Sequence, residues 1–326
     1  MKPINKIQMF SLFILLSGIV ILILGADKLV DGASSLAAKL GIPNIVIGLT
    51  IVAFGTSAPE LVVNVFAAVE GNTGIVLGNI LGSNIFNVLG ILGICSIIYP
   101  LSVKNSTTWI EIPLSLLAAL ALYIMANDVL FDQAGSDLLT RTDGLILLLF
   151  FAIFLVYNIM LSLNSTDVVG IEHKNYTYLK ATAYIILGLA GLVVGGRMIV
   201  TSAVTIAQLM GLSDRIIGLT VVSIGTSLPE LATSLAAVKR KNLDIAIGNV
   251  VGSNIFNIFF ILGISTVITT VPVQAASFVD IVLNILAGLL LFVFIFIGKG
   301  RNLERWEGMF FLAMYVVYLV FVTSYQ

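Results

Sequence analysis

Charged residues are scarce in this sequence. Of its 326 residues, 10% are charged and 59% are hydrophobic, and the mean hydropathy is +1.12. Such a chain has too few polar side chains to cover a water-soluble domain, so the class of soluble globular proteins is excluded. The net charge of −1 favours neither nucleic acid nor an acidic surface as a partner.

Cysteine and histidine each occur once. Cys95 lies in an apolar run, so a disulfide within the chain is excluded and a reactive thiolate has no support there. His173 lies in a polar segment without a cysteine nearby, which disfavours a transition-metal site built on these two residue types. No cofactor is therefore expected.

Long apolar runs recur along the whole chain. A bilayer core of about 30 Å needs about 20 apolar residues per helix, and the hydropathy pattern predicts about ten such spans. The first run follows Lys2 and Lys6 and has no small-residue cleavage site, so it is interpreted as a retained helix rather than a signal peptide. The predicted spans cover residues 10–38, 44–69, 74–97, 109–126, 143–163, 178–208, 215–238, 244–269, 276–298 and 306–324.

Two segments recur at a fixed spacing of 170 residues. The sequence GLTIVAFGTSAPEL at Gly48–Leu61 returns as GLTVVSIGTSLPEL at Gly218–Leu231, with ten of fourteen positions identical. The sequence GNILGSNIFNVLGILG at Gly78–Gly93 returns as GNVVGSNIFNIFFILG at Gly248–Gly263, with eleven of sixteen identical. The chain therefore contains an internal duplication.

The duplication predicts the domain organisation. With ten spans, equivalent elements are five spans apart, and an odd number places the second copy upside down in the membrane. We therefore predict an all-α polytopic membrane protein with two inverted five-helix repeats, an architecture typical of secondary transporters with a binding site near the midplane. The first repeat is assigned to residues 1–163, a short cytoplasmic linker to 164–177, and the second repeat to 178–326.

Positive charge is unevenly distributed between the two sides of the predicted topology. The side that holds the N-terminus carries four Lys or Arg residues, and the other side carries ten. The positive-inside rule then places both termini outside the cytoplasm, in a multi-pass protein of the cell membrane.

Glu60 and Glu230 are the most informative carboxylates, because each lies in the middle of an apolar span. Ionisable groups are costly at this depth and usually mark an ion or proton pathway. The alternative is a carboxylate paired with a nearby base, but neither repeated segment contains Lys or Arg. We therefore predict an ion-binding role for both glutamates.

The residues around each glutamate supply further oxygen atoms. Gly55 and Pro59 are expected to interrupt the helix and leave backbone carbonyls unpaired. Thr56 and Glu60 are four residues apart and share one helix face, with Ser57 beside them. Carboxylate, hydroxyl and carbonyl oxygens are the ligands of hard cations, and two glutamates would neutralise one Ca²⁺. The equivalent residues of the second copy are Gly225, Thr226, Ser227, Pro229 and Glu230.

The second motif adds two Ser-x-x-x-Asn pairs, Ser83 with Asn87 and Ser253 with Asn257. Each pair shares a helix face and is predicted to line the same cavity. The alternative is simple hydrogen bonding between helices, which Ser and Asn often provide in membranes. Four further asparagines are not assigned to the site, and some of them are expected to cap or cross-link the broken helices: Asn79, Asn84, Asn249 and Asn254.

Both motifs, GTSAPE with GSNIFN and GTSLPE with GSNIFN, resemble the α-repeats of the cation/calcium antiporter superfamily, particularly its prokaryotic sodium/calcium exchanger-like branch. The resemblance implies Na⁺ and Ca²⁺ as competing substrates, the lipid bilayer as the surroundings, and alternating access as the first and sixth helices slide. It also implies main-chain carbonyl ligands at Ala53 and Ser223. The implied side-chain ligands are Thr56, Ser57, Glu60, Ser83, Asn87, Thr226, Ser227, Glu230, Ser253 and Asn257.

Asn257 departs from those members of the superfamily that have Asp at the equivalent position. Asparagine in both copies weakens the case for K⁺ co-transport and leaves the coupling ion open, with H⁺ in place of Na⁺ as the second hypothesis. A passive cation channel is a third. An intramembrane hydrolase with Ser57 or Ser227 as nucleophile is disfavoured because no base lies beside either serine. The chain is predicted not to be an enzyme, and no obligatory protein partner is evident.

Overall fold

The computed structural model describes residues 6–164, 175–209, 223–297 and 300–324. The described chain is built from helices, and eight of them are long and apolar enough to cross a membrane. A further pair of shorter helices, Asn44–Thr56 and Ala58–Val69, is bent by 48° at its break, and the two together are long and apolar enough for one span. The all-α polytopic prediction is therefore confirmed. The predicted span at 215–238 lies partly outside the described residues.

Five of the long helices are continuous. They are α1 (Lys6–Leu40), α9 (Arg141–Asn164), α10 (Tyr178–Leu209), α16 (Ala275–Ile297) and α17 (Arg305–Ser324). α7 (Ile112–Met125) continues from a π-helical turn, η3 (Thr107–Glu111). The short α8 (Asp128–Phe131) lies in the loop between α7 and α9.

The repeated motifs form broken helices. The first Gly-Thr-Ser segment comprises α2 (Asn44–Ile47), η1 (Gly48–Val52), α3 (Ala53–Thr56) and α4 (Ala58–Val69), and the described part of the second comprises α12 (Ser223–Thr226) and α13 (Leu228–Lys239). The Gly-Ser-Asn segments form α5 (Thr73–Ile85), η2 (Phe86–Leu92) and α6 (Gly93–Ile98), then α14 (Leu243–Ile255), η5 (Phe256–Leu262) and α15 (Gly263–Ile268). The π-helical stretches η2 and η5 begin at equivalent residues.

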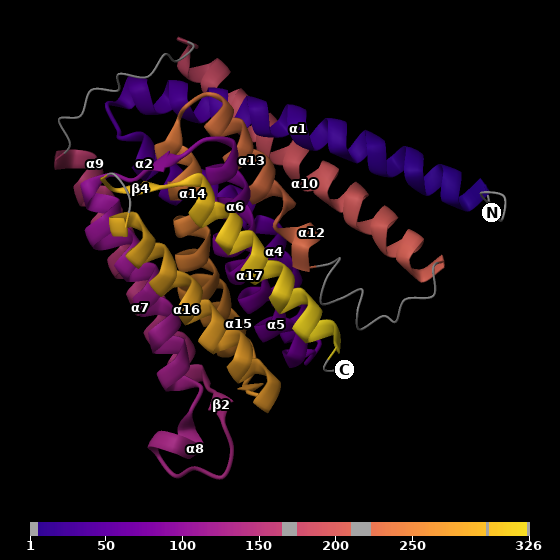
Figure 1. The fold of residues 1–326 in the computed structure, drawn as a ribbon, viewed down its shortest axis with the longest axis vertical. Helices are drawn as coiled ribbons and strands as arrows, with labels where there is room; N and C mark the ends of the chain where they lie inside the picture. Colours follow the sequence, from indigo (N-terminus) through magenta and orange to yellow (C-terminus); the bar gives the residue numbers. More distant parts are fainter. Residues whose placement is uncertain (1–5, 165–174, 210–222, 298–299, 325–326) are drawn as a thin grey trace.

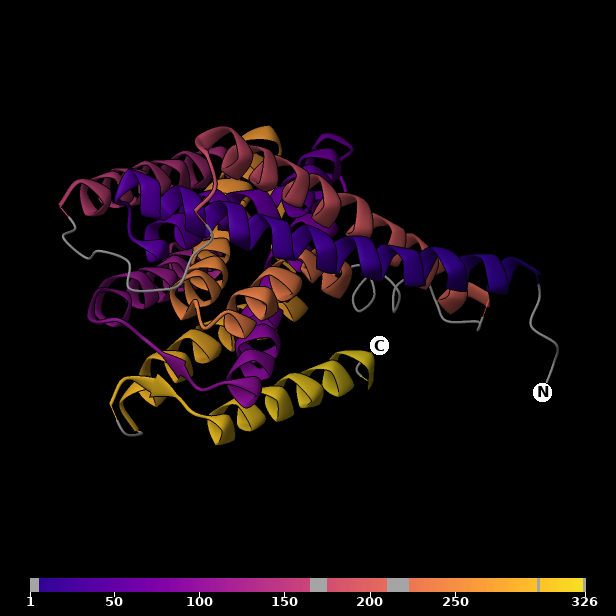
Figure 2. The same ribbon diagram turned by 90° about the horizontal axis from the view of Figure 1, so that it is seen from above.

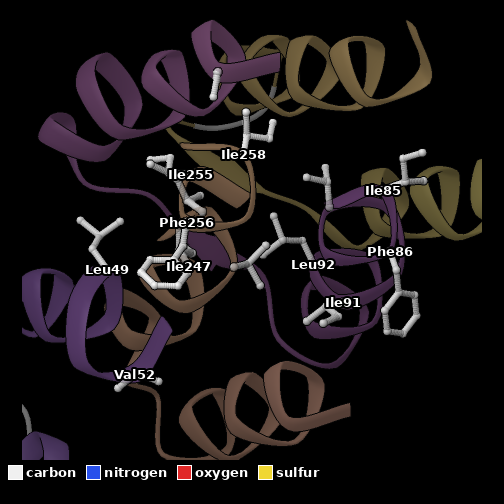
Figure 3. Packing of buried hydrophobic residues seen from close by; sticks show 14 of the residues in the cluster. Leu49, Val52, Ile85, Phe86, Ile91, Leu92, Ile247, Ile255, Phe256 and Ile258 are labelled. Atoms are coloured by element: carbon white, nitrogen blue, oxygen red, sulfur yellow. The ribbon is translucent and has the colours of Figure 1, made fainter. Parts of the chain in front are cut away.

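The Gly-Ser-Asn helices lie at the centre of the molecule. Most residues in the apolar part of these spans are buried, 83% in Thr73–Ile98 and 78% in Leu243–Ile268, against at most 33% in the other single-helix spans. Figure 3 shows Ile85 and Leu92 of the first half in the same apolar cluster as Ile255 and Ile258 of the second. Burying this surface holds the two copies of the motif against each other.

α1 and α10 run side by side along one face, as both views show (Figures 1 and 2), and α17 lies on the opposite side in Figure 2. Glycines bring their backbones together: a Cβ added to Gly25 would lie 2.9 Å from the Gly188 carbonyl oxygen. Gly18 of α1 and Gly195 of α10 approach each other in the same way about two helical turns away from this contact. Small residues at such spacing let membrane helices pack closely.

The two halves exchange equivalent contacts. β1 (Leu101–Ser102) pairs antiparallel with β4 (Asn302–Leu303), and β2 (Leu138–Leu139) pairs antiparallel with β3 (Val271–Pro272). Each strand thus finds its partner in the other half, and β2 and β4 lie toward opposite ends of the molecule (Figure 1). This reciprocity is the pattern expected of a pseudo-two-fold relation. The division at 164–177 stays a prediction, because residues 165–174 lie outside the described chain.

Candidate ion-binding site

Each Gly-Thr-Ser helix breaks at its serine. Ser57 separates α3 from α4 with φ −83° and ψ 7°, and Ser227 separates α12 from α13 with φ −88° and ψ 7°. A proline stands in the first turn of the helix that follows each serine, where a missing N–H is tolerated. The predicted interruption is therefore confirmed in both copies.

The main-chain carbonyl of Ala53, implied as a ligand by the resemblance, accepts hydrogen bonds within its own helix. Its oxygen accepts the Ser57 N–H at 2.9 Å and lies 3.3 Å from the Thr56 hydroxyl oxygen. Ala53 stays a predicted main-chain ligand, and its carbonyl keeps its helical hydrogen bond because the chain stays helical up to the break. Pro59 instead leaves the carbonyl of Gly55, four residues earlier, without its usual helical donor. Ser223 begins α12, and its side chain lies outside the described part of the chain.

The serines at the two breaks reach across to the glutamates of the opposite half. The Ser57 hydroxyl donates to Glu230 Oε1 at 2.8 Å, and the Ser227 hydroxyl donates to Glu60 Oε1 at 3.1 Å. Ser253 joins the first of these pairs, with its Oγ 3.0 Å from Ser57 Oγ and 3.4 Å from Glu230 Oε1. The two halves therefore meet at one polar centre.

This centre is closed to solvent. Glu60 and Glu230 are each 1% exposed, and none of the ten predicted side-chain ligands exceeds 6%. No ion pair joins either glutamate to a base among the described residues, where the ion pairs are those of Lys104 and Arg240. When ionised, two carboxylates held in this way carry charge that the protein itself does not neutralise.

Five oxygen atoms of the predicted ligand set are buried without a hydrogen-bond partner. They are Glu60 Oε2, Glu230 Oε2, Ser83 Oγ, Asn87 Oδ1 and Asn257 Oδ1. A buried polar atom without a partner costs about 1–3 kcal/mol, and more if it is charged. The described residues contain no cluster of three or more His, Cys, Asp or Glu side chains suited to a metal. The partnerless atoms of the predicted ligand set are all oxygens, which are the ligands that hard cations prefer.

The four asparagines left outside the predicted site all touch it. Thr56 donates to Asn249 Oδ1 at 3.0 Å, and Thr226 Oγ1 lies 3.3 Å from Asn79 Oδ1. Asn84 and Asn254 contact Asn257 and Asn87, each across the two halves. Their exact recurrence in both copies was the signal available in the sequence, but it did not distinguish a packing role from a role at the site.

The halves differ at one position beside the glutamates. Asn249 donates to the Glu230 carbonyl at 3.1 Å and to Ser234 Oγ at 2.9 Å. In the first half Asn64 occupies the place of Ser234 and itself donates to the Glu60 carbonyl at 2.8 Å. The two glutamates therefore have different surroundings despite the duplication.

Other charged residues lie away from this centre. Arg240, in the turn after α13, pairs with Asp27 at 3.1 Å and Asp31 at 3.2 Å on α1. The Lys28 ammonium lies 4.6 Å from the centre of the Tyr184 ring. The charged side chains of α1 named here thus contact neighbouring residues rather than the oxygen centre.

The fold and the site together define a polytopic membrane protein with two repeats joined around a buried centre of oxygen atoms. The family described as Sodium/calcium exchanger protein matches residues 10–160 and 180–324. The chain belongs to this sodium/calcium exchanger family.

Similar proteins cover nearly the whole chain. The putative antiporter CaxA of Alkalimonas amylolytica is 39% identical over 318 residues, covering 94% of this chain and 97% of its own. The sodium/calcium exchanger MaX1 of Methanosarcina acetivorans is 33% identical, covering 95% and 97%. A structure of the sodium-calcium exchanger NCX_Mj soaked with Na⁺ and Sr²⁺ superposes with a TM-score of 0.82 at 32% identity, covering 96% of this chain and 99% of that one.

Proposed function

We propose that this protein is a secondary active antiporter that exchanges Na⁺ for Ca²⁺ by alternating access, with no enzymatic step. The observation that supports this proposal is the reciprocal bonding of Ser57 with Glu230 and of Ser227 with Glu60, beside buried oxygen atoms that lack partners. Carboxylate, hydroxyl and amide oxygens are preferred by hard cations. The relatives named as sodium/calcium exchangers supply the identity of the two ions.

The charge of the centre explains why exchange would be coupled. When both are ionised, Glu60 and Glu230 carry two negative charges at a site where each side chain is 1% exposed. One Ca²⁺ or two Na⁺ would neutralise them, whereas an empty site would leave both charges buried and unpaired at a cost of several kcal/mol. The conformational change that moves the site between the two sides of the membrane is therefore favourable only when cations occupy it.

The proposed ligand set combines side chains from both repeats. Main-chain carbonyls at Ala53 and Ser223 are included, and the Ala53 carbonyl oxygen has two lone pairs, so it can bind an ion while it accepts the Ser57 N–H. The side chains proposed to bind the ions are Thr56, Ser57, Glu60, Ser83, Asn87, Thr226, Ser227, Glu230, Ser253 and Asn257.

The proposed topology places both termini outside the cytoplasm, following the excess of Lys and Arg on the opposite side. Single cysteines introduced at Lys104 and Gln133, in a Cys95→Ala background, would test it in intact cells. A membrane-impermeant maleimide should label the cysteine at 133 and not the one at 104. The reverse labelling pattern would show that both termini lie in the cytoplasm.

Ion-replacement experiments in proteoliposomes test the exchange itself. Vesicles loaded with Na⁺ and diluted into Na⁺-free medium containing ⁴⁵Ca²⁺ should accumulate Ca²⁺, and vesicles loaded with choline should not. Adding K⁺ should change nothing, because Asn257 supplies no third carboxylate. If Ca²⁺ uptake instead depends on an imposed pH gradient and is the same with and without Na⁺, the coupling ion is H⁺ rather than Na⁺.

A further inference from the structure

The helices α5 and α14 are linked where Asn84 meets Asn254. The Asn84 Nδ2 group donates to the Asn254 backbone carbonyl at 3.3 Å, and the Asn254 Nδ2 group donates to the Asn84 backbone carbonyl at 3.4 Å. A backbone carbonyl only accepts hydrogen bonds, so each side chain must turn its NH₂ group toward that carbonyl. The Oδ1 atom of each asparagine is therefore directed away from the backbone of its partner.

Each of these Oδ1 atoms meets a second asparagine. Asn257 Nδ2 donates to Asn84 Oδ1 at 2.9 Å, and Asn87 Nδ2 donates to Asn254 Oδ1 at 2.9 Å. An amide oxygen only accepts, so Asn257 and Asn87 must in turn present their NH₂ groups to it. The orientation of all four amides thus follows from the donors and acceptors themselves, which is the criterion for telling amide oxygen from nitrogen.

The two outer amides of this hydrogen-bonded series, those of Asn87 and Asn257, each leave an oxygen atom without a partner. Asn87 Oδ1 and Asn257 Oδ1 are buried without a hydrogen-bond partner, and the two residues are at most 1% exposed. Both belong to the first turn of a π-helical stretch, η2 or η5, and are equivalent in the two repeats. If either amide turned over, an NH₂ group would replace an oxygen atom and repel a cation.

We propose that Asn84 and Asn254 are positioning residues that force Asn87 and Asn257 to offer amide oxygen, and never NH₂, to the transported cation. We call the four residues the amide relay. This inference rests on the proposed cation-binding function of the same centre. Because each bond crosses between repeats, the relay also makes the ligand of one half depend on the helix of the other.

Equilibrium binding of ⁴⁵Ca²⁺ to the full chain in detergent tests the relay without requiring transport. Replacing Asn84 with Leu removes the acceptor for Asn257, and we expect the Kd for Ca²⁺ to rise by about tenfold, a coupling of ordinary size for residues in one hydrogen-bond network. Asn158→Leu is the matched control. This asparagine is buried in α9 and donates only to the Phe154 carbonyl of its own helix, so the Kd should stay within about twofold.

A double-mutant cycle separates positioning from general packing. If Asn84 acts through Asn257, then adding Asn84→Leu to an Asn257→Leu protein should change the Kd for Ca²⁺ by less than about twofold. An equal factor in both backgrounds would mean that Asn84 acts independently, and the relay would be overturned. Asn254→Leu in the Asn87→Leu background repeats the cycle for the other half.

Folding is monitored by size-exclusion chromatography and thermal unfolding, with Asn84→Ala as a smaller substitute for the Leu variant. A measurement on the unsubstituted chain keeps the test decisive if these variants unfold. With ¹³C in the side-chain amide carbon of asparagine, Ca²⁺ should shift the amide carbonyl infrared band to lower frequency, and an unchanged band would overturn the relay. If the unsubstituted protein binds no Ca²⁺, the proposed function is overturned. If it binds Ca²⁺ but the Kd is the same in the relay variants, only the relay is overturned.

Discussion

Replacing Glu230 with Gln changes the charge of the centre while leaving most of its contacts in place. The glutamine Oε1 can still accept from Ser57, as the carboxylate does at 2.8 Å. The other atom becomes an NH₂ group at the place of Oε2, which has no hydrogen-bond partner in the protein. The substitution therefore removes one negative charge and one candidate ligand without removing volume from the core.

The size of the effect follows from the burial of the group. Glu230 is 1% exposed, so its charge is screened little by solvent. Removing one partner of a buried ionic interaction costs about 3–5 kcal/mol, which corresponds to a roughly 10²- to 10⁴-fold weaker affinity for Ca²⁺. A centre with a single carboxylate should also lose its preference for divalent over monovalent cations, because one Na⁺ is then enough to neutralise it.

⁴⁵Ca²⁺ uptake by Na⁺-loaded proteoliposomes measures this loss, and thermal unfolding checks that the variant remains folded. Glu111→Gln is the matched control. Glu111 is also a fully buried carboxylate in a membrane span, and it accepts a hydrogen bond from Tyr157 at 2.6 Å that glutamine can retain. Glu111→Gln should transport at near the unsubstituted rate. Normal transport in Glu230→Gln or Glu60→Gln would refute the reasoning.

Four further substitutions test other parts of the structure. Ser57→Ala should weaken Ca²⁺ binding more than Ser227→Ala in equilibrium ⁴⁵Ca²⁺ titrations, because the Ser57 hydroxyl contacts both Glu230 and a second serine, and equal losses would contradict this. Gly188→Val should lower Tm and abolish transport, because its Cβ would lie 2.6 Å from an α1 backbone nitrogen. Overpacking of this kind costs about 1–3 kcal/mol. An unchanged Tm would show that α1 and α10 can separate freely. Arg240→Leu should also lower Tm, because it removes the ion pairs between Arg240 and two aspartates of α1, and an effect that is insensitive to added salt would argue against an ionic origin.

Most of the fold could be predicted from the sequence. Apolar runs of membrane-spanning length located the helices to within a few residues, since hydrocarbon demands continuous apolar segments. Proline and the charge-free surroundings of Glu60 located the broken span and its carboxylate. The π-helical stretches could not be predicted, because they depend on how α5 and α14 pack in the centre rather than on local preference. The domain boundary at 164–177 stays a prediction.

The sequence alone indicated that a lipid bilayer surrounds the protein, that the chain is duplicated, and which residue types meet at the centre. Hydropathy and a 170-residue repeat are properties of the chain alone. Only the tertiary structure decided that the Ser57 hydroxyl donates to Glu230 rather than to Glu60, and that the Ala53 carbonyl accepts the Ser57 N–H. It alone placed Asn84 and Asn254 behind the amides of Asn257 and Asn87. Helical spacing decides which residues share a face, whereas partners across two helices depend on where those helices cross.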